Sequence, residues 1–196
     1  MKSYTLLGLI KMFIFLLRTK FVFKNARIIR FPIDIRGKKF IQVSKGFTTG
    51  FGCRIEAYPL NGNKALFIGR NFQMNDYVHI TAMESVIIGD NVLIASKVYI
   101  SDCSHGSYSG DELDSDPDSI PKDRKMYSKP ILIEDNVWLG EFVSVLPGVT
   151  IGKGTIVGAN SVVTKSLPAN VIAVGSPAKP IKEFNFETKK WELIKK

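Results

Sequence analysis

The sequence predicts an all-β fold in which short parallel strands wind into a β-helix, and three observations predict it. From Ile68 onward an aliphatic residue recurs at every sixth position, a period that fits neither an α-helix nor an alternating antiparallel strand. A small or acidic residue often follows it, as at Gly69 and Gly89, where a sharp corner would need one. Four positions after the aliphatic residue stands a second side chain of buried type, as at Phe72 and Val78.

The six-residue pattern falls into three runs, separated by a two-residue slip and then by a long interruption. The repeated positions are Ile68, Met74 and Ile80, then Ile88, Ile94 and Ile100, and finally Ile133, Leu139, Val145, Ile151, Val157 and Val163. This period suits a coil with three short strands per turn, in which each hexapeptide forms one side of a triangular prism. We therefore expect a coil over residues 26–176, with residues 26–67 as irregular first turns.

The N-terminal segment, residues 1–25, is expected to form a helix. Residues 4–17 are strongly apolar but contain Lys11, and they fall short of the ~20 apolar residues that cross a bilayer. No small-residue cleavage site follows them, which disfavours a cleaved signal peptide. Two interpretations stay open: the helix packs on its own domain or on a neighbouring subunit, or residues 1–24 lie on the inner membrane surface.

The C-terminal segment, residues 177–196, is expected to be a basic tail. The repeats fade at Pro168, and Pro177 and Pro180 lead into a lysine-rich stretch that ends near Trp191. We predict a short helix there. With 196 residues in all, the chain is long enough for one domain with a sizeable core.

Charge and cysteine content narrow the function classes. The net charge of +9 indicates an anionic partner, which could be nucleic acid, a membrane surface or a phosphorylated cofactor, or else simply a solvated face. No nucleic-acid motif or aromatic–basic platform is present, so we expect no nucleic-acid partner. Cys53 and Cys103 make no disulfide framework, which indicates a reducing, cytoplasmic compartment. With two histidines and no CxxC pair, we expect no metal site.

Residues 137–182 carry a stretch that is specific to one family, VWLGEFVSVLPGVTIGKGTIVGANSVVTKSLPANVIAVGSPAKPIK. It resembles the C-terminal coils of the hexapeptide-repeat acyltransferases, above all the O-acetyltransferases of surface polysaccharides, lipopolysaccharide, galactosides and maltose. The resemblance covers residues 65–182. It implies a left-handed parallel β-helix, acetyl-CoA as the acetyl donor, a carbohydrate acceptor, and a homotrimer with active sites between neighbouring subunits.

Transfer of an acetyl group to a hydroxyl needs a base, and histidine suits this role because its pKa lies near working pH. His105 ends the run VYISDCSHG directly before the long interruption, where family members carry their catalytic histidine. The resemblance also matches Asn75 to an asparagine near that histidine that touches the acceptor. The plainer alternatives are a histidine that caps a coil and an ordinary corner asparagine. His79 falls outside the inward-pointing positions, so we expect a surface or corner role, with acceptor contact as the alternative.

Two positions depart from the family pattern. Cys103 stands where many polysaccharide O-acetyltransferases have a second histidine, and direct transfer in a ternary complex needs no cysteine nucleophile. Glu141 stands where small or amide residues are common, which puts the local contacts to the thioester in doubt.

Coenzyme A is a long polyanion with an apolar arm, and it needs a shallow groove that ends in basic residues. Small residues at Gly140 and Gly158 would keep such a groove open. The resemblance implies that the cofactor lies against Trp138, Gly140, Gly158, Ala159, Thr164, Lys165, Lys179 and Lys182. Backbone N–H groups near Gly140 are expected to stabilise the oxyanion of the tetrahedral intermediate.

The interruption, residues 106–129, is polar, acidic and rich in turn-forming residues. A loop of this length inside a tight repeat is usually functional. We expect it to wrap a neighbouring subunit and to form part of the acceptor site. Its acidic residues lack the spacing of a calcium loop.

Together these features predict an acetyl-CoA-dependent O-acetyltransferase that acts on a sugar hydroxyl in surface polysaccharide or lipopolysaccharide biosynthesis, by direct transfer with His105 as general base. The alternatives are a xenobiotic acetyltransferase of streptogramin or chloramphenicol type, an amino-sugar N-acetyltransferase, and a non-catalytic β-helix scaffold. The γ-type carbonic anhydrases share the prism but need three zinc-binding histidines, which excludes them here.

Overall fold

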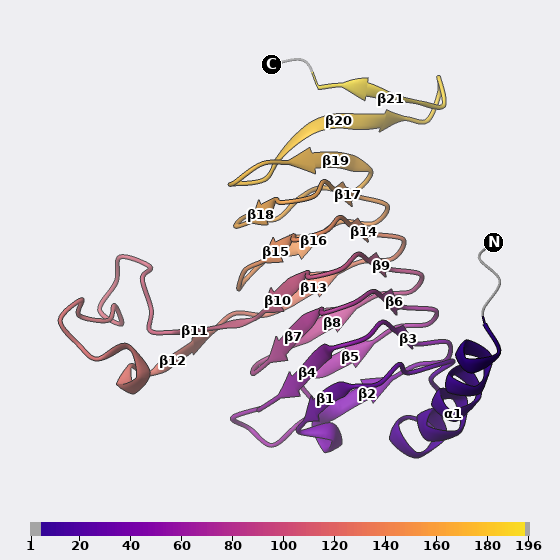
Figure 1. Ribbon diagram of the computed structural model, residues 1–196. Helices are drawn as coiled ribbons and strands as arrows, with labels where there is room; N and C mark the ends of the chain where they lie inside the picture. The colour runs from indigo at the N-terminus through magenta and orange to yellow at the C-terminus, as the bar shows by residue number, and fades with distance from the viewer. Residues whose placement is uncertain (1–4, 195–196) are drawn as a thin grey trace.

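The chain winds as a coil whose turns stack into three sheets, which are parallel except for the last two strands of one of them (Figure 1). This computed structural model describes residues 5–194, so the predictions for residues 1–4 and 195–196 lie outside the described part. Each turn places one strand in each sheet, and hydrogen-bonded neighbours are therefore one turn apart in the sequence. The expected all-β class is confirmed.

The three sheets are named here by number. Sheet 1 contains β1 (Ile33–Arg36), β4 (Cys53–Ala57), β7 (His79–Ala82), β10 (Tyr99–Ser101), β15 (Ser144–Val145) and β18 (Val162–Val163). Sheet 2 contains β2 (Ile41–Val43), β5 (Leu66–Ile68), β8 (Val86–Ile88), β13 (Ile131–Ile133) and β16 (Thr150–Ile151). Sheet 3 contains β3 (Thr48–Thr49), β6 (Gln73–Met74), β9 (Leu93–Ile94), β14 (Trp138–Leu139), β17 (Ile156–Val157), β19 (Val171–Val174), β20 (Lys179–Asn185) and β21 (Lys190–Leu193).

The core is the ladder that the six-residue period predicts. All twelve repeated aliphatic residues are buried, and in sheet 1 Ile80, Ile100, Val145 and Val163 stand in register on successive turns. Burial of each such side chain contributes about 1.5–3 kcal/mol. Toward the C-terminal end Thr155 replaces an apolar residue, and its hydroxyl donates to the Pro168 carbonyl at 2.7 Å. The first turns belong to the same stack, because β2, β3 and β4 pair with β5, β6 and β7.

The corners use more residue types than the pattern indicated. Asparagines such as Asn91 take a left-handed conformation there, and so do Tyr77, Lys97 and Phe142. This conformation costs a residue with a side chain about 1–2 kcal/mol. It is held in place because each of these N–H groups donates to the turn before it, from Tyr77 to the Phe51 carbonyl at 2.8 Å for example.

The predicted N-terminal helix is α1 (Leu6–Val22), and it packs beside the first turns (Figure 1). Its one fully buried residue, Thr19, accepts a hydrogen bond from the Ile29 N–H at 2.8 Å. The Phe15 ring lies 5.9 Å from the ring of Phe31 and 5.8 Å from that of Phe51. Among residues 5–194, no helix has the length and apolar character to span a bilayer.

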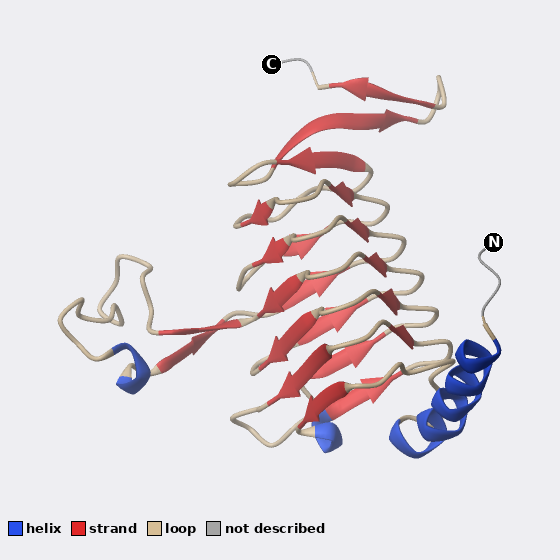
Figure 2. Cartoon of the chain, in the orientation of Figure 1, coloured by secondary structure: helices blue, strands red, loops and turns tan. Residues whose placement is uncertain are grey.

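The predicted C-terminal helix is wrong. Residues 179–193 form an antiparallel hairpin, β20 and β21, which adds to β19 (Figure 2). Phe184 and Trp191 are paired across the two strands, with ring centroids 5.2 Å apart. Such an aromatic cross-strand pair stabilises a hairpin, whereas a helix would separate the two rings.

The long interruption leaves sheet 1 after β10 and projects away from the coil (Figure 1). Its base is an antiparallel pair, β11 (Cys103–His105) and β12 (Met126–Ser128). The projecting part contains the short 3₁₀ helix η2 (Pro121–Asp123), and a second one, η1 (Lys38–Phe40), lies in the first turns. Arg124 holds the loop together, because its guanidinium donates to the carbonyls of Pro117 and Ser119.

Candidate active site

His105 is exposed at the end of β11, where the loop begins to project. Its backbone is held from two sides: the residue is paired with Met126 of β12, and its carbonyl accepts the Tyr108 hydroxyl at 2.5 Å. Arg124 in turn donates to the Tyr108 oxygen at 2.8 Å. The main chain at His105 is therefore fixed while its imidazole stays accessible.

A cavity of about 610 Å³ lies beside His105. Its lining combines hydroxyls with aromatic and aliphatic side chains from several turns. These residues are Tyr58, Thr81, Met83, Tyr99, Ser101, Cys103, Ser104, His105, Met126, Leu146 and Pro147. Hydroxyl groups beside aromatic rings suit a ligand with polar edges and an apolar face, which a sugar ring has.

Asp102 anchors the start of the loop to the coil. This carboxylate is fully buried and accepts the N–H groups of Met83, Glu84 and Ser85 at 2.8, 2.7 and 2.8 Å. Burial raises the pKa of the Asp102 carboxyl, although its three N–H donors act in the opposite direction. Sequence reasoning missed this residue; the available signal was an acidic residue directly after a predicted strand.

Cys103 is half-buried, with its Sγ 3.5 Å from the Ser101 hydroxyl. Burial raises the pKa of the Cys103 thiol. The thiol is therefore protonated at neutral pH, and a protonated thiol is a poor nucleophile.

His79 points outward from β7 into a charged cluster that the sequence did not reveal. Its Nε2 lies 3.1 Å from Glu56 Oε2 and 3.0 Å from the Thr81 hydroxyl. Glu56 is buried and also pairs with Arg54 and Arg36. Burial raises the pKa of Glu56, but the hydrogen bonds from His79 and Arg54 outweigh it, so this pKa lies below its ordinary value. Because Thr81 also lines the cavity, the cluster borders the site.

Asn75 and His105 are not brought together within one chain. Asn75 lies at the corner where the chain passes from β6 to β7, and it therefore precedes a strand of sheet 1. His105 follows the end of β10, another strand of the same sheet. Because β7 and β10 are parallel, the two residues lie at opposite edges of sheet 1.

Most of the residues expected at the cofactor gather along sheet 3 and its corner with sheet 1. Trp138 is 47% exposed on β14 and stands in register with Ile156, Ile172 and Lys182 on successive strands. A Cβ at Gly140 would lie 2.7 Å from the Ala159 nitrogen, so only glycine fits this close stacking of turns.

The remaining residues that were expected at the cofactor lie in two places. A Cβ at Gly158 would lie 2.7 Å from a methyl group of Val174. Val174 in turn pairs with Lys179, so Gly158 and Lys179 lie at the same corner. Thr164 and Lys165 are exposed just beyond the other end of β18.

The Gly140 N–H does not meet the expectation of an oxyanion donor. It donates to the Val157 carbonyl at 2.8 Å and thus belongs to the ladder between turns. Within residues 5–194, no group of three or more His, Cys, Asp or Glu side chains is arranged to hold a metal ion.

Comparison with known proteins places the chain in a family. Residues 130–165 match the family model described as bacterial transferase hexapeptide (six repeats). WbbJ of Escherichia coli (strain K12), assigned to lipopolysaccharide biosynthesis as an O-acetyl transferase, is 47% identical over 191 residues, which cover 97% of this chain and 96% of that protein. The galactoside O-acetyltransferase of the same organism is 43% identical over 120 residues, 61% of this chain and 55% of that protein.

Solved structures with this fold include acyltransferases. A galactoside acetyltransferase in complex with coenzyme A has a TM-score of 0.53 at 35% identity, over 80% of this chain and 68% of that one. The N-acyltransferase AntD from Bacillus cereus has a TM-score of 0.67 over 84% of both chains; at 22% identity it shows the fold alone. With a relative that matches over nearly its whole length, the chain belongs to the hexapeptide-repeat acyltransferases and is an acetyltransferase.

Proposed function

We propose that this protein transfers the acetyl group of acetyl-CoA to a hydroxyl of a carbohydrate acceptor, in the biosynthesis of surface polysaccharide or lipopolysaccharide. The observation that carries the proposal is the exposed imidazole of His105 beside a cavity of about 610 Å³ with hydroxyl and aromatic lining. The names of the relatives support it, because they describe acetyl transfer in lipopolysaccharide biosynthesis and to galactosides.

In this reaction His105 takes the proton of the acceptor hydroxyl while the hydroxyl oxygen attacks the thioester carbonyl carbon. The carbonyl oxygen becomes an oxyanion. When the tetrahedral intermediate collapses, the carbon–sulfur bond breaks and the imidazolium returns the proton to the leaving thiolate. The products are the acetyl ester and free coenzyme A. The protonated state of Cys103 supports this direct route over an acetyl-cysteine intermediate.

The coenzyme would lie along sheet 3 and its corner, against Trp138, Gly140, Gly158 and Ala159. Lys179 and Lys182 continue this line and would face the phosphates. His105, Thr164 and Lys165 lie beyond one edge of sheet 1. Asn75 lies at the other edge, in the same stacked corner as Gly140 and Gly158. A site that combines the two sets therefore takes them from different chains. A homotrimer with sites between subunits meets this requirement, with the loop of residues 106–129 reaching the neighbour.

We further infer a left-handed winding of the coil and a cytoplasmic location, both on the resemblance to the family. Residues 1–24 would hold the enzyme at the inner face of the membrane, close to a lipid-linked acceptor.

The test is thiol release from acetyl-CoA with a panel of sugars, lipid-linked glycans, amino sugars, streptogramins and chloramphenicol. We expect carbohydrate-dependent release in the wild type and a loss of about 100-fold or more in kcat for His105→Ala. The matched control is Cys103→Ser, which should keep most of the activity.

Equal rates for wild type and His105→Ala would show that this histidine is not the base. Turnover with an antibiotic but with no sugar would show that the acceptor is a xenobiotic and not a carbohydrate. Loss of activity in Cys103→Ser, with acetyl-enzyme found in the wild type by mass spectrometry, would replace direct transfer with a covalent route.

A further inference from the structure

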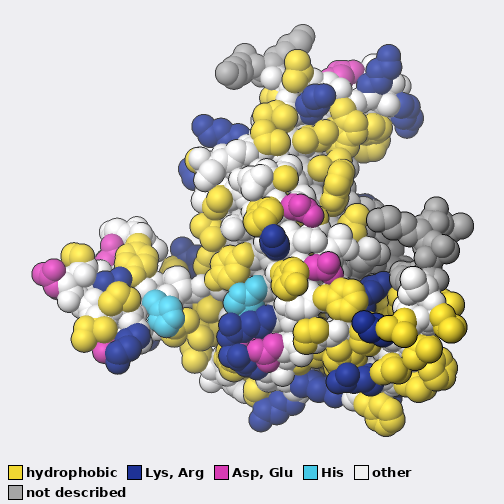
Figure 3. Space-filling view, viewed as in Figure 1, with side chains coloured by type: hydrophobic (Ala, Val, Ile, Leu, Met, Phe, Trp, Pro, Cys, Tyr) yellow, Lys and Arg dark blue, Asp and Glu magenta, His cyan; other side chains and the backbone are white. Residues whose placement is uncertain are grey.

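One face of α1 is apolar and has no partner among the described residues. Its side chains are Leu6, Ile10, Phe13, Leu17 and Phe21, whose spacing of three or four residues aligns them along the helix. All five are exposed, Phe13 by 62% and Phe21 by 86%. Figure 3 shows hydrophobic side chains gathered over this part of the molecule.

The opposite face of α1 accounts for how the helix is attached. Met12, Phe15, Thr19 and Val22 are the less exposed positions, and Phe15 and Thr19 contact the first turns directly. The coil therefore holds the helix by one side and presents the other. An apolar helix face of this length on a protein surface indicates an interaction site.

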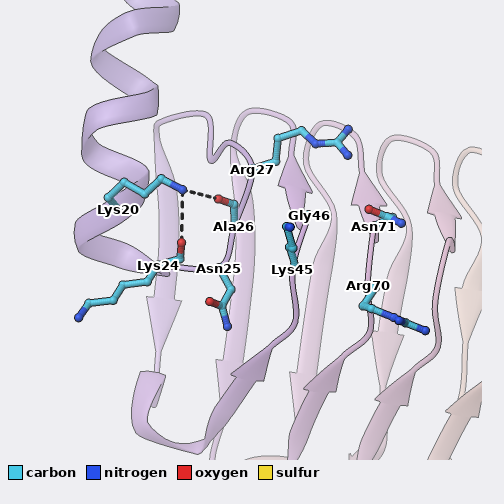
Figure 4. A pocket seen from close by; sticks show the side chains of 9 residues that line it. All are labelled: Lys20, Lys24, Asn25, Ala26, Arg27, Lys45, Gly46, Arg70 and Asn71. Carbon is cyan, nitrogen blue, oxygen red and sulfur yellow. Dashed lines mark hydrogen bonds between the residues drawn. The ribbon is translucent and has the colours of Figure 1, made fainter.

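A second feature lies at the C-terminal end of the same helix. A cavity of about 630 Å³, the basic groove, is lined by Lys20, Lys24, Arg27, Lys45 and Arg70, and no acidic side chain lines it (Figure 4). It is similar in volume to the cavity beside His105 and is built from other elements. Lys20 and Lys24 come from the end of α1 and the residues after it, whereas Lys45 and Arg70 come from corners between sheets 2 and 3.

The five basic side chains of the groove differ in their interaction partners. Lys20 donates to the carbonyls of Lys24 and Ala26 at 3.3 and 3.2 Å and so shapes the wall (Figure 4). Arg70 is paired with Asp90 at 2.7 Å. The remaining three cations, Lys24, Arg27 and Lys45, are exposed and make no ion pair with an acid of the described chain.

The charge of the residues at the corner between sheets 2 and 3 changes along the coil. Backbone bonds stack Lys45, Arg70, Asp90 and Asp135 as equivalent positions of successive turns. The two positions nearest α1 are basic and the next two are acidic. Over these four turns the positive charge lies at the end of the coil that carries the apolar helix, and the turn after Asp135 has a lysine again, Lys153.

We propose that the basic groove binds the phosphate groups of anionic phospholipids while the apolar face of α1 enters the same bilayer surface. The inference rests on the proposed association of residues 1–24 with the membrane and extends it to Arg27, Lys45 and the groove. Ammonium and guanidinium groups complement phosphate, and an apolar helix face beside them complements the acyl-chain boundary. A soluble phosphate would account for the groove but leave the apolar face uncovered.

The experiment is flotation of the full-length protein with vesicles of phosphatidylcholine alone or mixed with phosphatidylglycerol. The groove variant is Lys24→Gln, Arg27→Gln and Lys45→Gln together. Its control removes the same charge elsewhere, at the exposed Lys64, Lys153 and Lys190, each replaced by Gln. A helix variant, Phe13→Gln, Leu17→Gln and Phe21→Gln, tests the apolar face.

We expect wild type and control to bind the anionic vesicles, and the groove variant to bind about 100-fold more weakly, since each basic residue contributes about five-fold at an anionic surface. The helix variant should lose binding while its sedimentation mass stays that of the wild type. Acetyl transfer to a soluble acceptor should be the same in all four proteins.

Several outcomes would overturn the inference, and each is distinct from failure of the proposed enzymatic function, which the acetyl-transfer assay measures separately. If the groove variant floats as well as wild type, the groove does not bind lipid phosphate. If wild type binds no vesicle, the membrane association fails as well. If inorganic phosphate alone saturates the groove and vesicles do not bind, the ligand is a soluble phosphate. If the helix variant changes the sedimentation mass, the apolar face is a subunit contact.

Discussion

Glu56 is the residue whose environment most depends on the fold. Its carboxylate is almost fully buried, yet it receives His79 and Thr81 from the next turn along sheet 1 and Arg54 from its own strand. Burial alone would favour the protonated form. The hydrogen bonds outweigh it and lower the pKa of Glu56 below the ordinary value of 4.5.

This lowered pKa predicts a pH-dependent stability. A carboxyl whose pKa is lower in the folded state stabilises the fold above its ordinary pKa, and this contribution is lost as the pH falls through the folded-state pKa. We expect Glu56→Gln to lower the unfolding free energy by about 2 kcal/mol near neutral pH, and by much less near pH 3. Urea unfolding of wild type and variant at both pH values measures this difference in unfolding free energy. Glu112→Gln, in the exposed loop, is the control and should change little at either pH. An equal loss for Glu56→Gln at both pH values would contradict the argument.

At the scale of elements, the β11–β12 pair determines where His105 stands. The pair begins one residue after Asp102, and this buried carboxylate holds three N–H groups of the turn from β7 to β8. His105 is thus positioned through a contact between two turns of the coil. The projecting loop supports itself through Arg124 and turn-capping carboxylates such as Asp114, which accepts the Ser109 and Gly110 N–H groups.

Replacing Asp102 tests its role in holding the β11–β12 pair to the coil. Asp102→Ala leaves three N–H groups without their acceptor, which should cost about 3 kcal/mol and lower Tm by about 10 °C. Because β11 loses its attachment, kcat should fall even at temperatures where the variant is folded, with KM for acetyl-CoA little changed. Calorimetry and steady-state kinetics measure the two effects, and Asp102→Asn should recover part of both. A fall in Tm without any fall in kcat would show that Asp102 stabilises the coil but does not position His105.

At the scale of the whole molecule, one chain presents two of the predicted site residues at separate edges of sheet 1. His105 and Asn75 lie at opposite edges of sheet 1, and the parallel register of β7 and β10 prevents them from meeting. If both serve one reaction, they come from different subunits.

This arrangement predicts complementation between subunits. His105→Ala and Asn75→Ala should each be nearly inactive alone. Trimers of differently tagged subunits, co-expressed in equal amounts and purified through both tags, should regain about a third of the wild-type sites, since each mixed ring of three has one interface at which both neighbours supply the intact residue. The activity of the mixed oligomers measures this, and separately purified homo-oligomers combined without subunit exchange are the control. No recovery in the mixed oligomers would place both residues in a site within one chain, or remove Asn75 from it.

The sequence by itself determined the coil and its core. One inward side chain per short strand is a local requirement that repeats, so a period of six is visible without any knowledge of contacts. Ile80, Ile100 and Val145 could be assigned to the ladder for this reason. The position of His105 at the start of the interruption was equally visible, because a loop of that length breaks the repeat.

Only the tertiary structure decided which residues of different turns meet. The contacts of Glu56 with His79 and of Asp102 with the turn after β7 join residues one turn apart, and they depend on register. The same holds for Lys45 and Arg70, which occupy equivalent positions of successive turns and line the basic groove together. The two-residue slip and the long interruption shift that register by amounts that periodicity does not reveal. The C-terminal hairpin has the same origin: its lysine-rich sequence permits a helix, and the pairing of Phe184 with Trp191 on the exposed edge of β19 favours strands instead.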